Sequence, residues 1–393
     1  MSSVLPPVVI PTSSHTLSVV PVRSRQQLRQ FVRFPYQLYA SYPAWVAPLE
    51  RDRYTLLNKR RNPFFQHATA QLWLALHGAS PVGTIAAYVD HLAPAAQRGC
   101  FGCFECVDDL AVARALLDTA AAWVQAHGVP SLRGPFNFAA DNDCGVLLDA
   151  YDQPPTLMTT YNPPYYPALL TQAGFTKETD WYAYTIDPQL LGMTQTDALP
   201  PRLARAVALA QQRSRATLRP INLRQFQQEF ARAQAIYNQA WAANEGFVPM
   251  TDAEVADLAY RLRPFIAPDL IYFAEDAGTP VGMSIALPDL HQVLHPLRGQ
   301  LLPFGWWRVL HWRRHVDTLR FFAMGVLPAY RRQGIEALFY AETLQAALRH
   351  GYRRAELSLV VESNMSMRRS AEAFGAQIAK TYRIYSRSCG HEP

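Results

Sequence analysis

Apolar and polar residues follow the same order in two parts of the chain, about two hundred positions apart. Residues His15–Val22 alternate between apolar and polar, which predicts a strand, and Ser24–Tyr39 carries apolar residues at helical spacing. Thr217–Leu223 and Gln225–Trp241 repeat this strand and this amphipathic helix. The pattern therefore predicts strands and helices arranged in two similar halves.

Two predicted hairpins strengthen the repeat. Leu72–His91 and Ile271–His291 each contain an apolar run, a turn with glycine and a second apolar run. Both carry the triplet Pro-Val-Gly, which begins at Pro81 and at Pro280, 199 positions apart. A shared offset of this kind is typical of internal repeats.

We interpret the chain as a tandem duplication whose boundary lies in the weakly patterned stretch Pro188–Pro201. This divides the chain into a first domain of residues 1–190 and a second of residues 200–393. Each is expected to be a mixed α/β domain (α+β), because strands and helices alternate in both.

Composition narrows the class of protein. The 393 residues are 49% hydrophobic and 12% aromatic, which suits folded cores, and the net charge is +6. No Lys/Arg block or zinc-finger spacing is present, so nucleic acid is not an expected partner. The N-terminus lacks a signal-peptide pattern, no apolar run reaches about 18 residues, and the cysteine count of five is odd. We expect a cytoplasmic protein, with contact at the inner face of the membrane as an alternative.

Phe321–Tyr340 holds the strongest candidate for a phosphate site. Its apolar start predicts a strand to Val326, followed by Pro328, two arginines, Gly334 and a helix. Helix N-termini present unpaired backbone N–H groups that attract phosphate, and glycine allows a close approach. An ordinary strand–helix junction with solvated arginines is the alternative.

The first copy differs at the same point. It carries Asp108 and Asp109 where the second copy has its arginines and Gly334. Two carboxylates cap a helix well but repel a pyrophosphate. We expect the first copy to lack cofactor binding.

Cys100, Cys103 and Cys106 raise the question of a metal site, with Cys144 as a fourth ligand. In a regular strand, Cys100 and Cys106 face one side and Cys103 the other, which opposes a shared metal. We therefore expect buried thiols and no metal. The histidine pairs His291/His295 and His311/His315 lack the glutamate of a zinc motif and are interpreted as structural.

An aromatic and basic insert precedes the phosphate loop. Leu301–Phe322 contains Trp306, Trp307 and Trp312 interleaved with arginines. Such a mixture suits a lipid headgroup interface, which predicts peripheral membrane contact through Leu301–Arg314. The alternative is an insert whose tryptophans complete the core.

Candidate acid–base groups follow strands. Ala355–Val361 reads as a buried strand that ends at Glu362 and Asn364, and Asp289 ends a hairpin strand. Glu362 is the first candidate for a general base and Asp289 the second. Helix capping or a solvated carboxylate is the alternative for each.

The phosphate loop resembles a known motif. Val326-x-Pro328-x-x-Arg331-x-x-Gly334 is similar to the acyl-CoA-binding motif of the GNAT (Gcn5-related N-acetyltransferase) superfamily. Glu336 stands where a second small residue is usual, and Ala371 where many members have a tyrosine as general acid. Tyr382 or Tyr385 on the next strand are alternatives for that hydroxyl. The resemblance implies that acyl-CoA contacts Met324, Gly325, Val326, Arg331, Arg332, Gln333, Gly334, Ile335, Glu336 and Ala337.

Nearly the whole chain, from Leu17 to Arg387, resembles a narrower group. The segment AELSxxxExNxxMRRxxExxGxxxxKTYRIY from Ala355 and the segment GPFNFAADNDCGVLLDAYDQPP from Gly134 are similar to the bacterial ceramide synthase-like family. This implies two tandem GNAT-like domains and transfer of a fatty acyl group from acyl-CoA to a long-chain amine.

The resemblance also implies a mechanism. The amine would enter between the halves, beside Asn137–Pro155 and the aromatic insert, and attack the thioester directly. Backbone N–H groups near Met324–Val326 would polarise the carbonyl. Two alternatives stay open: a tandem GNAT transferase that uses aminoacyl-tRNA, and a non-catalytic binding or regulatory protein, which Glu336 and Ala371 would suit.

Overall fold

The computed structural model describes residues 16–138, 143–187, 199–242, 247–303 and 305–390. His15, most of the predicted boundary Pro188–Pro201 and part of the insert Asn137–Pro155 lie outside these residues. No helix in the described part of the chain is long and apolar enough to cross a membrane.

The first half follows the predicted order of strands and helices. Its strands are β1 (Leu17–Pro21), β2 (Ala68–His77), β3 (Ser80–Asp90), β4 (Gly99–Cys106), β5 (Ser131–Gly134), β6 (Val146–Leu147) and β7 (Thr176–Ile186). Its helices are α1 (Arg25–Leu38), α2 (Glu50–Leu56), α3 (Leu110–Ala126) and α4 (Tyr166–Gln172).

The second half repeats much of this order. Its strands are β8 (Thr217–Pro220), β9 (Ile271–Asp276), β10 (Thr279–Pro288), β11 (Thr318–Val326), β12 (Arg354–Val361) and β13 (Gln377–Ser388). Its helices are α5 (Pro201–Arg213), α6 (Phe226–Ala240), α7 (Asp252–Leu262), α8 (His291–Leu294), α9 (Gly305–Leu310), α10 (Ile335–Arg349) and α11 (Met365–Ala373). The predicted strands, helices and hairpins named above are confirmed within a few residues.

Local sequence signals explain where several helices begin. Ser24 forms a capping box with Gln27 at the start of α1, and Thr251 does so with Glu254 at α7. Asp109 accepts hydrogen bonds from the Ala111 and Val112 amides and caps α3, as expected for a carboxylate at this point.

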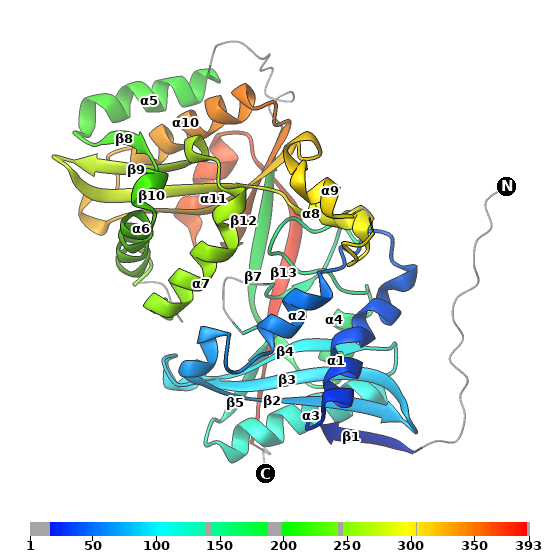
Figure 1. The fold of residues 1–393 in the computed structure, drawn as a ribbon. Helices are drawn as coiled ribbons and strands as arrows, with labels where there is room; N and C mark the ends of the chain where they lie inside the picture. Colours follow the sequence, from blue (N-terminus) through cyan, green and yellow to red (C-terminus); the bar gives the residue numbers. More distant parts are fainter. Residues whose placement is uncertain (1–15, 139–142, 188–198, 243–246, 304, 391–393) are drawn as a thin grey trace.

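One continuous sheet joins the two halves. Its order is β1-β2-β3-β4-β5-β13-β7-β12-β11-β10-β9-β8, with β6 beside β13. The last strand of each half therefore pairs with the other half: β7 lies on β12, and β13 lies on β5. Figure 1 shows β7 and β13 side by side between the two halves, with the C-terminus in the first half. The division into residues 1–190 and 200–393 stays a prediction about the chain.

Helices cover both faces of the sheet in each half. In the first half α3 and α4 pack on one face and α1 on the other. In the second half α5, α10 and α11 pack on one face, and α6 packs on the opposite face. Two layers of helices around one sheet bury both faces of the central strands.

Candidate active site

Strands β11 and β12 separate partway along their length. They pair in parallel only from Thr318 opposite Arg354 to Phe321 opposite Leu357. Beyond Phe321, β11 continues to Val326, and among the described residues it pairs there with β10 alone. The backbone of β11 on the side of β12 is therefore unpaired in this gap and can accept or donate hydrogen bonds to a ligand.

A bulge lies at the start of the gap. Ile285 pairs with Ala323 and Ala286 pairs with Phe321, so Phe322 has no opposite residue in β10. Bulges of this kind redirect the backbone next to binding sites. Met324 and Gly325, predicted to contact acyl-CoA, lie just beyond the bulge and along the open edge.

The phosphate loop joins β11 to α10. Gly334 is the N-cap of α10 with φ +85°, a left-handed conformation that glycine adopts without strain. A Cβ at Gly334 would also lie 2.8 Å from Ala210 Cβ on α5. Gly334 is thus required by the backbone turn and by the packing of α5, in addition to any phosphate that binds the α10 amides.

The two arginines of the loop have different surroundings. Arg331 donates hydrogen bonds to the Ala240 carbonyl at 2.6 Å and to the Val326 carbonyl at 3.3 Å, so it ties the loop to the end of α6. Arg332 is exposed with φ +65° and has no hydrogen bond or ion pair within the described residues. Arg332 is therefore the arginine that is free to bind a phosphate.

The remaining predicted cofactor residues divide into packing and surface positions. Ile335 and Ala337 are buried in the core beneath α10, so only their backbone can face a ligand. Gln333 and Glu336 are partly exposed, and Glu336 lies in the first turn of α10. Its carboxylate is favourable for the helix dipole and lies next to the amides that a phosphate would use.

Trp241, the residue that follows α6, lies on β11 beside the gap. A Cβ at Gly325 would lie 2.2 Å from the Trp241 ring, so the indole rests directly on β11. Trp241 stacks on Tyr237 with ring centroids 4.7 Å apart. The absent side chain of Gly325 therefore makes room for an apolar cover on this part of the strand.

The predicted catalytic residues do not meet at one point. Glu362 forms an ion pair with Lys177 at 2.7 Å, and Asn364 caps α11 by accepting a hydrogen bond from the Met367 amide. Helix capping was named above as an alternative for this region, whereas the ion pair of Glu362 was not expected. Both residues follow β12 on the far side of the gap from the phosphate loop.

Asp289 belongs to a buried polar network between the halves. It accepts hydrogen bonds from the amides of Leu157 (2.8 Å) and His291 (3.1 Å), and burial raises its pKa to about 7. Arg320 donates to the Leu157 carbonyl, and Lys380 donates to the Pro154 carbonyl. Buried charges of the second half thus hold residues 154–157 of the first half.

Tyr382 lies in the middle of β13 and is fully buried. Burial raises the pKa of its hydroxyl far above its usual value, while the nearby Thr159 side chain acts in the opposite direction. No hydrogen bond of ordinary geometry to this hydroxyl is present within the described residues. Tyr385 is also buried in the core, as a packing residue of β13.

A cavity of about 120 Å³, called the polar cavity below for its many polar side chains, lies in the first half, and His291 of the second half reaches it. Residues of α1, β4, the loops 135–162 and the second half line it, among them Tyr39, Arg53, Glu105, Asp143, Tyr166 and His291. Glu105 accepts hydrogen bonds from the hydroxyls of Tyr39 (2.7 Å) and Tyr166 (2.9 Å). Burial raises the pKa of Glu105 to about 7, so the cavity contains a carboxyl group that exchanges its proton near neutral pH.

His291 is the most informative residue of this cavity. Its Nδ1 lies 2.9 Å from the Pro155 carbonyl, which can only accept, so Nδ1 carries a proton. Burial lowers the pKa of His291, so the imidazole is neutral at pH 7 and Nε2 keeps its lone pair. Nε2 has no hydrogen-bond partner within the described residues, which leaves it available as a base.

Comparisons with known proteins agree with this geometry. The Acetyltransferase (GNAT) family profile matches residues 233–376, which contain the gap and the phosphate loop. A protein of Caulobacter vibrioides named "Bacterial ceramide synthase" is 34% identical over 95% of this chain and 97% of its own length. The chain belongs to the bacterial ceramide synthase-like family of GNAT N-acyltransferases. A second relative, "Protein YghO" of Escherichia coli, is 32% identical over 93% of each chain.

Solved structures support the fold of this N-acyltransferase. A tandem GNAT protein from the clavulanic acid biosynthesis pathway aligns with TM-score 0.53 and 12% identity, over 96% of this chain and all of its own. A GNAT protein from Sphaerobacter thermophilus aligns with TM-score 0.53 and 13% identity, over 95% and 96% of the two chains. The mixed α/β fold with two GNAT-like halves is thus confirmed.

Sequence reasoning missed two residues of the polar cavity in this acyltransferase. Glu105 is the only carboxylate in the apolar strand run GCFGCFEC, and a lone charge in such a run is a signal of a buried site. His291 was interpreted as structural from its spacing to His295. Its position two residues after Asp289, at the end of a hairpin strand, was the better signal.

The cysteines give one confirmation and one correction. Cys100, Cys103, Cys106 and Cys144 are all buried, as expected for internal thiols. Their predicted faces were wrong, since Cys100 and Cys103 share one core while Cys106 lies in another. Cys103 has φ +46° beside a register shift between β3 and β4, which breaks the regular alternation of side chains.

Proposed function

We propose that this acyltransferase moves a long-chain acyl group from acyl-CoA to the amine of a lipid. The observation that carries the proposal is the gap between β11 and β12 that opens beyond Phe321 and leads to the N-terminus of α10. A thioester in this gap has unpaired backbone N–H groups beside it, and its pyrophosphate reaches the helix N-terminus. The identity of 34% to a protein named a ceramide synthase supports a lipid amine as acceptor.

Within this proposal the phosphates bind the first amides of α10 and the side chain of Arg332. Arg331 acts indirectly, because its guanidinium already holds the loop against α6. The unpaired amides of β11 near Met324 face the thioester oxygen. Preorganised backbone donors of this kind stabilise the charge that develops on the oxygen during attack.

The amine reaches the thioester from the side of the polar cavity, which His291 borders. Its nitrogen attacks the carbonyl carbon, the C–S bond breaks, and CoA leaves as a thiolate that takes up a proton. The nitrogen must lose a proton, and we assign its acceptance to His291 Nε2, because the Pro155 carbonyl keeps the proton of this imidazole on Nδ1. Glu105, Glu362 and Asp289 remain candidates for a second proton acceptor.

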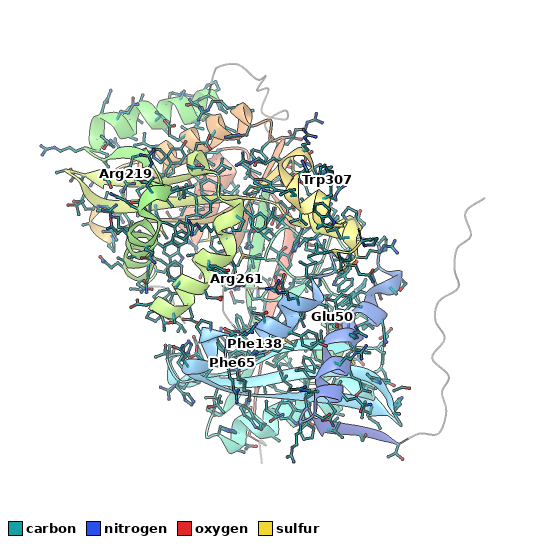
Figure 2. The ribbon with its side chains drawn as sticks, in the orientation of Figure 1. Glu50, Phe65, Phe138, Arg219, Arg261 and Trp307 are labelled. Carbon is teal, nitrogen blue, oxygen red and sulfur yellow. The ribbon has the colours of Figure 1, made fainter. Side chains whose placement is uncertain are left out.

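The aromatic insert suits delivery of a lipid acceptor. Trp306 is 50% exposed and Trp307 57% exposed, beside exposed Leu310 and arginines. Trp312 instead packs in the core, so the two predicted roles of the insert apply to different tryptophans. Figure 2 places Trp307 on the outer side of the second half, away from the junction near Arg261. We include in the proposal that 301–314 contacts a membrane surface peripherally.

The test is an acylation assay with purified protein and a long-chain acyl-CoA. The acceptors are a long-chain amino alcohol, a short amine with the same polar head and an amino acid. We expect release of CoA thiol and an amide product, seen by mass spectrometry, with the long-chain amine only. Equal rates with the short amine would refute a lipid acceptor, and no thiol release with any amine would refute the transferase function.

A further inference from the structure

An apolar cavity of about 420 Å³ lies on the α10 and α11 face of the sheet in the second half. Leu319 and Phe321 of β11 and Ala355 and Leu357 of β12 line it from the sheet. Helices α10 and α11 and the first turn of α5 close it from the other side. None of the residues predicted to be catalytic or to bind cofactor lines this cavity.

The cavity begins where the two strands separate. Phe321 and Leu357 are the last paired residues of β11 and β12, and both line the cavity. Helix α10 contributes Tyr340, Thr343, Leu344 and Ala347, which form one face of the helix. A ligand with its phosphates at the N-terminus of α10 and its thioester in the gap would therefore have the cavity directly beyond the thioester.

The polar acceptor side lies across the sheet. Arg320 stands between Leu319 and Phe321 in β11, so its side chain points to the opposite face. There it donates to the Leu157 carbonyl, in the segment beside Pro155 and Thr159 of the polar cavity. The apolar cavity and the segment 155–159, which borders the polar cavity, thus lie on opposite faces of β11.

We propose that the apolar cavity holds the acyl chain of the acyl-CoA substrate; this rests on the proposed function. The charged residues of the lining, Arg202, Arg205, Arg354 and Glu372, are exposed, whereas Tyr340, Thr343 and Tyr352 bring hydroxyl groups to its buried wall. A methylene group has a volume similar to that of a water molecule, about 30 Å³. A cavity of 420 Å³ therefore accommodates roughly a dozen methylene groups. The site therefore selects long acyl chains.

Two substitutions on one helix face give opposite predictions. Leu344→Ala enlarges the cavity and moves the preferred acyl length up by about three methylenes. Ala347→Leu fills part of the cavity, so that the longest acyl chains no longer fit completely. Each methylene that loses its place lowers kcat/KM for such a chain by about fourfold, or about 60-fold for three methylenes. Gln345→Leu places the same leucine side chain on the exposed side of α10 and leaves the length preference unchanged.

The experiment measures kcat/KM for saturated acyl-CoAs of increasing length with one amine, then for amines of increasing length with one acyl-CoA. Opposite shifts of the acyl optimum in the two variants support the proposal. Equal changes at every acyl length overturn it, and so does a shift confined to the amine series, which assigns the cavity to the acceptor.

Binding measurements separate this inference from the proposed function. Calorimetric titration with CoA and with acyl-CoAs of increasing length needs no acceptor and no turnover. We expect the affinity for CoA alone to be equal in wild type and both variants, and the length dependence of acyl-CoA affinity to shift. If wild type binds with this length dependence but releases no CoA, the function fails while the cavity assignment stands. If affinity does not depend on acyl length, the assignment is wrong.

Discussion

His67 joins the two halves through two carboxylates. Its Nδ1 lies 2.8 Å from Asp90 of β3, and its Nε2 lies 3.2 Å from Glu254 of α7. The side chain is only 10% exposed. Only the protonated imidazole can donate to both carboxylates at once, so the junction favours His67 in its charged form.

The magnitude follows from the pKa of His67. Hydrogen bonds to Asp90 and Glu254 raise this pKa from 6.5 to about 9. A rise of about 2.5 units at 1.36 kcal/mol per unit corresponds to about 3 kcal/mol of folding free energy. Because the folded pKa is the higher one, this stabilisation is fully present below pH 6.5 and is lost as the pH rises to about 9.

The perturbation is His67→Gln, which removes the titrating group. Urea unfolding of wild type and variant is measured from pH 6 to pH 10. We expect the difference in unfolding free energy to be about 3 kcal/mol larger at pH 6 than at pH 10. The control is His350→Gln, because His350 pairs with Asp269 on the surface at 44% exposure and contributes roughly 0–1 kcal/mol.

One result would refute the reasoning directly. If wild type and His67→Gln lose stability in parallel over this pH range, His67 does not carry the linkage. A histidine NMR titration gives an independent readout, since a His67 pKa near 6.5 would also contradict the ion pairs.

Three further predictions concern the site. His291→Gln is expected to lower kcat by about 100-fold or more. Wild type should keep its rate from pH 8 to below pH 6.5, because the lowered pKa of His291 keeps the imidazole neutral. A steep fall of the wild-type rate already near pH 7 would contradict a neutral base. Arg332→Ala should raise KM for acyl-CoA in a salt-dependent manner. Arg331→Ala should lower the midpoint of thermal unfolding, because the Val326 and Ala240 carbonyls lose their donor. If Arg331→Ala instead changed KM and Arg332→Ala changed the unfolding midpoint, the two roles would be wrongly assigned. Replacing Trp306 and Trp307 by serine should reduce sedimentation with anionic vesicles and leave thermal unfolding unchanged; unchanged sedimentation would exclude these side chains from membrane contact.

Local order and the phosphate loop were accessible from sequence. The strand to Val326, the turn and the start of α10 follow from residues that are neighbours in the chain, and the glycine conformation at Gly334 depends on its own backbone. The caps at Ser24, Asp109 and Thr251 are equally local, because each involves residues within a single turn. Such interactions span few residues, so a sequence pattern contains all of their participants.

The roles of individual polar residues depended on partners far away in the chain. Arg331 could be recognised as a basic loop residue, but its bond to the Ala240 carbonyl spans 91 positions. Asp289 was a candidate base from its place after a strand, but its contact with the Leu157 amide, which puts it in the network between the halves, spans 132 positions. His291 became a candidate base because the Pro155 carbonyl fixes its tautomer.

The sequence alone predicts two halves of similar order, a glycine turn before α10 and a family membership that the relatives confirm. Three features appear only in the folded chain: the pairing of β7 and β13 with strands of the opposite half, the apolar cavity beside the gap between β11 and β12, and the polar cavity that His291 reaches. The physical reason is that strand pairing and cavity walls join distant residues, which are more than 200 positions apart where β13 pairs with β5. A periodic pattern specifies which face of an element is buried, and leaves open which distant element covers it.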